Sequence, residues 1–142
     1  MLSVTPYLNF KGNCRAALDV YVRVLGAKLE FVQTFGESPM DAQAGGVTKD
    51  QIIHARLNIG GTVVMASDAP ADKYETPRGM MLSVNVDDAK DADRIFGELS
   101  SGGSVSMPIQ ETFWAERFGM CVDRFGTPWM VNCMKAMAEA TG

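Results

Sequence analysis

Two hydrophobic patterns alternate along this chain. Short stretches place an apolar side chain at every second position and end in glycine or polar residues, which is typical of half-buried strands. Two longer stretches repeat apolar residues with a helical period, namely Ala17, Val20, Tyr21 and Val24, and then Ala92, Ile95, Phe96 and Leu99. The chain is therefore predicted to contain two amphipathic helices among several short strands.

The predicted helices occupy residues 13–25 and 87–99, and Asn13 and Gly26 have the residue types that cap and end the first of them. The predicted strands occupy residues 4–10, 28–35, 51–59, 62–67, 80–86, 104–109, 119–122 and 129–133. Glycines are expected to form the turns of two hairpins, at 60–61 and within 123–126.

The second half of the chain repeats the first. A shift of 65 residues places Gly61, Thr62 and Met65 on Gly126, Thr127 and Met130. The two helical stripes repeat as well, at a larger shift that the longer loop 36–50 accounts for. We therefore predict an α+β fold with two βαβββ modules in tandem, forming a curved mixed sheet with the helices on one face.

These modules are expected to make a single domain over residues 1–142. The repeats cover about 1–67 and 80–134, and the proline-containing, charged stretch 68–79 links them. Loop 36–50 is either a mobile loop over a site or a plain connector. Residues 135–142 are expected to form a short helical tail.

Alternation along the strands separates two faces of the sheet. The set expected to pack under the helices is nearly all apolar: Pro6, Leu8, Phe10, Ile53, Ala55, Leu57, Ile59, Val64, Ala66, Leu82, Val84, Val86, Met120, Val122, Trp129 and Val131. The opposite set is mixed: Thr5, Tyr7, Asn9, His54, Arg56, Asn58, Met65, Ser67, Met81, Ser83, Asn85, Cys121, Asp123, Met130 and Asn132. Because tyrosine and thioether groups are unusual choices for open water, we expect a concave, partly wet trough there.

Composition excludes several classes of partner. The net charge is −4 with no basic run, which argues against a nucleic-acid surface. No apolar stretch is long enough to span a membrane, and the N-terminus lacks a leader pattern, so we expect a cytoplasmic protein with no membrane partner. The three cysteines have neither CxxC nor metal-ligand spacing and are expected to be reduced thiols. We expect Cys14 to be a buried, unreactive thiol; because it lies in a first helical turn, a lowered thiol pKa is the alternative.

Three strings resemble a known family: PYLNFKGNCRAALDVY, IIHARLNIGGTVVMASDAP and QETFWAERFGMCVDRFGTPWMVNC. Together with the duplicated module, they resemble the PhnB-like branch of the vicinal-oxygen-chelate superfamily, which includes glyoxalase I, extradiol dioxygenases and bleomycin-resistance proteins. Proteins of this branch are often labelled 3-demethylubiquinone-9 3-methyltransferase. The chain has no glycine-rich motif that would bind S-adenosylmethionine, so the label carries little weight here.

The resemblance also implies where a metal would bind. Metal-dependent relatives place His, Glu or Gln ligands at positions that correspond to Thr5, Met65, Met80 or Met81, and Met130 of this sequence. Thioethers suit soft ions rather than the divalent metals of those enzymes. We therefore expect no metal and no cofactor, and the loss of the chemistry that depends on Lewis acidity.

His54, the one histidine, is the candidate catalytic residue, because its pKa range suits a general base and Arg56 lies two residues away on the same face. A hydrogen-bonded structural histidine is the alternative. A carboxylate or cation from the closing segment is a candidate partner: Glu111, Glu116, Arg117 or Asp123. Phe113 and Trp114 are expected to form a lid or wall, or simply to pack.

Two functions remain open from the sequence. The first is a homodimer that binds a small anionic or oxygen-rich organic molecule without a metal, by analogy with bleomycin-resistance proteins. The second is a metal-independent enzyme that uses His54 with Arg56 or Arg117. The predicted ligand-binding residues are Tyr7, His54, Arg56, Met65, Trp114, Arg117, Cys121 and Met130.

Overall fold

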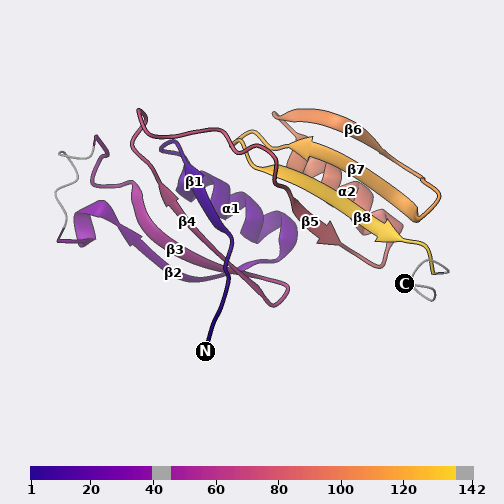
Figure 1. The fold of residues 1–142 in the computed structure, drawn as a ribbon, viewed down its shortest axis with the longest axis horizontal. Helices are drawn as coiled ribbons and strands as arrows, with labels where there is room; N and C mark the ends of the chain where they lie inside the picture. Colours follow the sequence, from indigo (N-terminus) through magenta and orange to yellow (C-terminus); the bar gives the residue numbers. More distant parts are fainter. Residues whose placement is uncertain (40–45, 137–142) are drawn as a thin grey trace. The chain divides into compact units, whose positions relative to one another are not determined.

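A computed structural model of the chain describes residues 1–39 and 46–136 (Figure 1). The chain divides into two compact units, Met1–Glu75 and Thr76–Gly142. In its described residues, each unit contains one α-helix and its own four-stranded mixed sheet. That the two units together act as a single domain stays a prediction.

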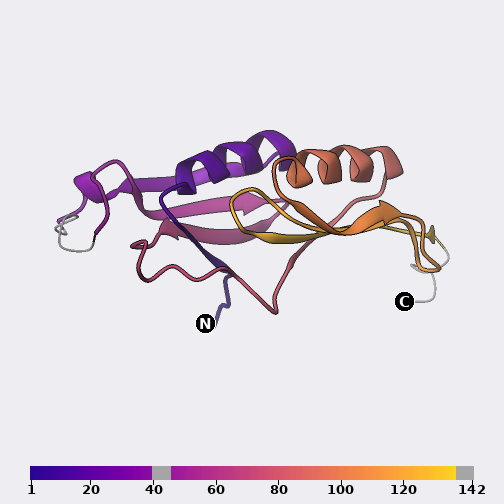
Figure 2. The same cartoon turned by 90° about the horizontal axis from the view of Figure 1, so that it is seen from above.

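The first unit contains β1 (Tyr7–Phe10), α1 (Cys14–Leu25), β2 (Lys28–Thr34), β3 (Ile52–Ile59) and β4 (Thr62–Asp68), with a short 3₁₀ helix, η1 (Phe35–Glu37), after β2. The strand order is β1-β4-β3-β2. β1 pairs with β4 in parallel, and the other pairs are antiparallel. α1 packs on β2, β3 and β4 and covers one face of this sheet (Figure 2); the opposite face is called the open face below.

The second unit contains β5 (Leu82–Asn85), α2 (Ala89–Ser100), β6 (Ser104–Gln110), β7 (Ala115–Val122) and β8 (Pro128–Met134). Its strand order, β5-β8-β7-β6, repeats that of the first unit, again with one parallel pair between the first and last strands. α2 packs on β6, β7 and β8. The predicted α+β fold of two βαβββ modules is confirmed.

Asp68 holds the start of α1 in place. Its carboxylate is buried, accepts a hydrogen bond from the backbone N–H of Cys14 at 3.0 Å, and accepts another from Ile52 at 2.9 Å. The prediction that the Asn13 side chain caps this helix is wrong, because its Oδ1 instead accepts a hydrogen bond from the N–H of Lys11. A carboxylate from a distant strand therefore replaces the local cap, which the local sequence pattern could not indicate.

The turns follow the predicted glycines. Gly60 and Gly61 both have positive φ, as a two-residue hairpin between β3 and β4 requires. Between β7 and β8, Gly126 has a φ of 97° and donates to the carbonyl of Asp123. The Asp123 side chain is also buried and accepts three hydrogen bonds, from the N–H groups of Phe125 and Thr127 and from the indole of Trp129.

Element ends differ from prediction mainly where strands begin. β1 and β5 start later than expected, whereas β7 starts earlier, at Ala115. In the predicted loop 36–50, residues 40–45 lie outside the described residues. The flanks are paired, because the N–H of Gly36 donates to the carbonyl of Lys49. The predicted tail helix lies almost entirely outside the described residues. Neither α1 nor α2, the α-helices of the described ranges, has the length and apolar character needed to cross a membrane.

Candidate functional site

The open face of the first unit, opposite α1, carries a row of side chains that crosses all four strands. Register partners place Phe31 of β2 beside Arg56 of β3, Arg56 beside Met65 of β4, and Met65 beside Tyr7 of β1. Directly paired residues point to the same face of a sheet. We call this set the Arg56 row.

The helix-covered side of the same strands is apolar. Ala55 and Leu57 alternate with Arg56 on β3, and their partners on β4 are Ala66 and Val64. All four side chains are at most 4% exposed. Arg56 and His54 therefore lie on the face that the sequence pattern assigned to them, since a slip of one residue would bury the guanidinium among these aliphatics.

His54 lies between two aromatic rings on the open face. Its Nδ1 is 3.3 Å from the Tyr7 hydroxyl, within hydrogen-bond distance. The ring centroids of Tyr7 and Phe31 are each 5.9 Å from that of His54. Tyr7 and Phe31 remain 46% and 47% exposed, so these rings present apolar surface to solvent next to a group that can accept or donate a proton.

Arg56 is exposed and makes no ion pair with any residue in the described parts of the chain. Its neighbours in the row are a thioether and a phenyl ring, neither of which neutralises its charge. A guanidinium in this setting can form two parallel hydrogen bonds to a carboxylate or phosphonate. Among its described residues, the first unit thus offers a guanidinium without an ion-pair partner, flanked in its row by apolar side chains.

The second unit carries the equivalent row with different chemistry. Register partners place Met107 of β6 beside Met120 of β7, Met120 beside Met130 of β8, and Met130 beside Ser83 of β5. We call this set the Met120 row. Met130 is the repeat partner of Met65, as predicted, but the central position holds Met120 where the first unit has Arg56.

The prediction that Cys121 faces the trough is wrong. A Cβ on Gly119 would lie 2.6 Å from Cε1 of Phe96 on α2, so this strand parity faces the helix. Cys121 shares the parity and is fully buried, next to Trp129, which is also buried. Burial and, to a smaller degree, the nearby charge of Asp123 raise the pKa of the Cys121 thiol to about 11. Met120 and Val122, expected under the helix, lie on the open face instead.

One residue in a turn explains this error. The stretch of chain between Met120 and its partner Met130 is one residue longer than the stretch between Arg56 and its partner Met65. The shift that aligns Met65 with Met130 therefore aligns Arg56 with Cys121 in the sequence, but with Met120 in space. Because side chains alternate with a period of two, that single residue reverses the face of every side chain on β7.

Arg117 also departs from its predicted place. Its Nε donates to Oδ1 of Asp93 on α2 at 2.7 Å, so the side chain extends toward the helix side rather than into the open face. This ion pair is partly exposed and adds little to stability. Arg117 is therefore removed from the candidate ligand-binding residues and as an electrophile for His54.

The carboxylates proposed as partners for His54 or Arg56 are engaged within the second unit. Glu111 pairs with Lys135 at 2.8 Å, which holds the pKa of the Glu111 carboxyl below its usual range. Glu116 accepts a weak hydrogen bond from the Cys133 thiol at 3.7 Å. The Asp123 carboxylate accepts hydrogen bonds from two N–H groups of its turn and from the indole of Trp129. Each of these three carboxylates therefore has a partner within its own unit.

Trp114 packs as a wall at one end of the second open face. Its ring meets Phe118 edge to face at 5.2 Å between centroids, and Phe113 meets Trp114 in the same manner at 4.8 Å. Phe118 shares the strand parity of Met120. Phe113 projects outward and is 89% exposed. Trp114 is half-buried and belongs to the open face of this unit alone.

Cys14 is not an activated thiol. The side chain is fully buried, and burial together with the Asp68 charge raises its pKa to about 12. The prediction of a buried, unreactive Cys14 is confirmed, and the alternative of a lowered pKa is excluded because desolvation of the thiolate outweighs the helix dipole. Cys133 is also buried, and all three cysteines are free thiols.

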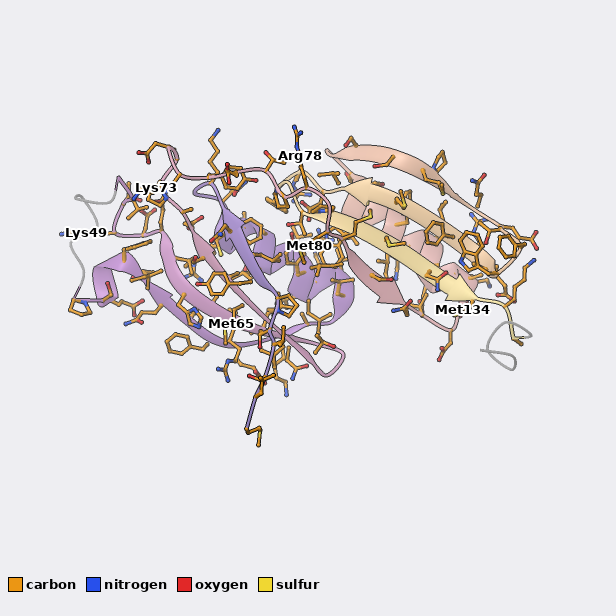
Figure 3. The ribbon with its side chains drawn as sticks, in the orientation of Figure 1. Lys49, Met65, Lys73, Arg78, Met80 and Met134 are labelled. Atoms are coloured by element: carbon orange, nitrogen blue, oxygen red, sulfur yellow. The ribbon has the colours of Figure 1, made fainter. Side chains whose placement is uncertain are left out.

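The residues that could hold a metal do not suit a divalent ion. In residues 1–39 and 46–136, no cluster of three or more His, Cys, Asp or Glu side chains is arranged to bind one. Met65 and Met130 lie on the two open faces, while Thr5 precedes β1 and Met80 and Met81 precede β5; Figure 3 labels Met65 and Met80. Thioether and hydroxyl groups are poor ligands for zinc, manganese or iron at such sites.

Sequence reasoning missed three residues of the two rows: Phe31, Met107 and Met120. Regular alternation would place Phe31 on the same face as Leu29, but a β-bulge between them turns Phe31 to the open face. Met107 follows a similar irregularity in β6. All three side chains are apolar, so residue type alone does not separate them from those that pack under the helices.

Comparisons with known proteins find relatives along nearly the whole chain. A family model described as 3-demethylubiquinone-9 3-methyltransferase matches residues 2–132. Protein YjdN from Escherichia coli is 38% identical over 142 residues, which cover 94% of this chain and 97% of that protein. The crystal structure of PA1353 from Pseudomonas aeruginosa is 48% identical with a TM-score of 0.85, over 94% of this chain and 98% of that one.

More distant structures share the fold alone. A putative 3-demethylubiquinone-9 3-methyltransferase, PhnB protein, from Bacillus cereus has a TM-score of 0.80 at 21% identity, over 93% of this chain and 99% of that one. A mutant of the fosfomycin resistance protein FosX from Listeria monocytogenes, complexed with Mn(II) and a phosphonic acid, has a TM-score of 0.66 at 8% identity, over 100% and 99% of the two chains.

Proposed function

We propose that this chain, which belongs to the 3-demethylubiquinone-9 3-methyltransferase family in the PhnB-like branch of the vicinal-oxygen-chelate superfamily, binds a small anionic organic molecule without a divalent metal. The observation that carries the proposal is Arg56, an exposed guanidinium without an ion-pair partner among the described residues, at the centre of an otherwise apolar row. The binding surface is the open face of the first unit.

The side chains around Arg56 define the kind of molecule. A carboxylate or phosphonate group would take the guanidinium in a two-point hydrogen bond. Phe31, Met65 and Tyr7 would cover an apolar or aromatic body, since thioethers and ring faces pack well against such groups. The Tyr7 hydroxyl and His54 add hydrogen-bonding capacity at one side. We therefore propose an organic acid with a hydrophobic portion, rather than a sugar or a polyanion.

The proposal leaves out both a resident divalent metal and methyl transfer. The family resemblance implies that Met65 and Met130 stand where metal-dependent relatives have His, Glu or Gln. The family description names a methyltransferase, yet this sequence has no glycine-rich strand–turn–helix motif for S-adenosylmethionine. Elemental analysis of protein purified without chelators is expected to find no stoichiometric zinc, nickel, manganese or iron. A stoichiometric amount of any of these would contradict this part of the proposal.

A second candidate function, metal-independent catalysis, is favoured by the Tyr7–His54 contact. A hydroxyl 3.3 Å from Nδ1 would orient the imidazole and leave Nε2 available as a general base, with Arg56 as the electrophile. Both residues come from the first unit. Binding and catalysis then differ in the role of His54: its removal would weaken binding modestly in the first case and abolish turnover in the second.

A thermal-shift screen of organic acids tests the proposed function. Wild-type protein, Arg56→Ala and the control Arg94→Ala are each screened against aliphatic and aromatic carboxylates and phosphonates. Arg94 is an exposed arginine on α2, so its loss removes the same charge away from the open face. We expect acids that stabilise the wild type and Arg94→Ala but not Arg56→Ala. Equal shifts in all three proteins would exclude an Arg56 site.

The acids that bind are then incubated with wild-type and with His54→Ala protein, which shows whether any acid is converted.

A further inference from the structure

The proposed function does not involve the Met120 row, which contains three methionines. Met107, Met120 and Met130 are consecutive register partners across β6, β7 and β8, on the face opposite α2. All three are half-buried, so their side chains are neither sealed in the core nor fully in solvent. The fourth member, Ser83, adds a hydroxyl on β5.

The spacing lets the three sulfur atoms meet. Directly opposed residues in neighbouring strands have their Cβ atoms about 5 Å apart. A methionine side chain is unbranched, with three rotatable bonds, and its thioether can reach across that distance. The two outer methionines flank the central one, so both sulfurs can approach that of Met120 from opposite sides.

The chemistry of these sulfurs selects a class of ligand. Thioethers are neutral, soft donors that favour Cu(I) and similar ions over hard or borderline divalent cations. Leucine would supply the same apolar contact at these positions, so what methionine adds is its polarisable sulfur. Cys121 lies on the opposite, helix-covered side of β7, so its sulfur does not face the three thioethers.

We propose that Met107, Met120 and Met130 form a three-thioether site for a soft monovalent metal ion, Cu(I), on the open face of the second unit. The site lies on β6, β7 and β8, and Arg56 takes no part in it. It therefore stands independently of the anion site: Met120→Leu is expected to leave acid binding intact, and Arg56→Ala to leave metal binding intact.

The ligand set also predicts an unusual pH dependence. Metal sites built from histidine or cysteine weaken as the pH falls, because protons compete for the donor atoms. A thioether carries no proton in this range. Affinity for the soft ion should therefore be the same at about pH 6 and about pH 8, on either side of the ordinary histidine pKa of about 6.5.

Titration with Ag(I), a redox-inert ion of the same charge and softness, tests the site. The protein is labelled with ¹³C at the methionine methyl groups, and each signal is assigned by single Met→Leu variants. We expect three of the ten methionine signals, those of Met107, Met120 and Met130, to shift together and to saturate at one Ag(I) per chain. Cu(I) under anaerobic reducing conditions should shift the same three signals.

The matched control is Met134→Leu, an exposed methionine that ends β8 and lies outside the row (Figure 3). Met120→Leu should weaken Ag(I) binding by roughly tenfold or more, whereas Met134→Leu should not change it. The methyl spectrum itself shows that each variant is folded, since leucine replaces methionine at little cost. Scattered shifts without saturation, an affinity that rises with pH, or binding unchanged by Met120→Leu would each overturn the proposal.

Discussion

Arg56 in the first unit and Met120 in the second occupy the same place in their sheets. Each lies at the centre of an open-face row, and each is the register partner of a methionine on the adjoining strand, Met65 or Met130. The two repeats therefore keep the same frame while presenting a cation in one row and a thioether in the other. This difference is why we assign the two open faces to different ligands.

The approach of α2 to β7 depends on Gly119. A Cβ there would lie 2.6 Å from the Phe96 ring and 3.0 Å from the Cα of Ile109, and the backbone atom cannot move aside cheaply. Gly119→Ala is expected to lower the free energy of unfolding by about 1–3 kcal/mol in urea denaturation. The control is Gly97→Ala on α2, where a Cβ would meet no described atom within 4 Å. That variant should gain roughly 0.5–1 kcal/mol from helix propensity. The reverse order of stabilities would show that α2 does not pack on β7 at this point.

The Asp68 carboxylate joins the start of α1 to β3. Asp68→Ala would leave the buried N–H groups of Cys14 and Ile52 without their acceptors, and each such group costs about 1–3 kcal/mol. We expect a loss of about 2–5 kcal/mol in the free energy of unfolding by urea denaturation. Asp19→Ala, at an exposed position on α1, should change stability by less than about 0.5 kcal/mol. Similar effects of the two substitutions would count against a structural role for Asp68.

The sequence predicted the fold and the candidate site correctly wherever the helices and strands follow a regular pattern. The helical stripes and hairpin glycines are local signals, so the two modules and the order of elements along the chain followed from them. Arg56 and His54 were placed correctly because Ala55 and Leu57 alternate with them without interruption. In the second unit, an additional residue in the turn between Met120 and Met130 reversed the predicted face of β7, and with it the placement of Cys121.

Bulges and long-range contacts account for the rest. The bulge after Leu29 carries Phe31 to the open face, and nothing in the local residues marks where a ladder is interrupted. The contact of Asp68 with Cys14 joins residues far apart in the sequence, as does that of Arg117 with Asp93. Such partners are set by tertiary packing, which single-sequence periodicity does not encode.

The buried thiol of Cys14 makes stability depend on alkaline pH. Its pKa is raised from 9.0 to about 12 in the folded protein, so an unfolded chain loses this proton first as the pH rises. The contribution to stability is complete below about pH 9 and is lost progressively above it, at about 1.4 kcal/mol per pH unit. Urea denaturation between about pH 8 and pH 10.5 should show this decline, and Cys14→Ala should reduce its slope. An identical slope in the variant would mean that Cys14 is not protected from ionisation.

We expect the protein to be a homodimer. Each four-stranded sheet has two edge strands, and apolar side chains such as Phe31, Phe113 and Met80 are substantially exposed in the isolated chain. Exposed edges and apolar surface of this kind are usually covered by a partner. Multi-angle light scattering should report twice the chain mass of 15.4 kDa. A mass of a single chain at micromolar concentration would rule out a stable dimer.

The central claim is that Arg56 anchors an anionic ligand on the open face of the first unit. Isothermal titration calorimetry with the tightest-binding acid from the screen tests it most directly, on wild-type protein, Arg56→Ala and Arg94→Ala. Loss of a charge-assisted hydrogen bond is expected to weaken binding to Arg56→Ala by about 1.5–3 kcal/mol, which is roughly 10- to 150-fold in the dissociation constant. Binding to Arg94→Ala should equal that of the wild type. An affinity for Arg56→Ala that matches the wild type would contradict the account.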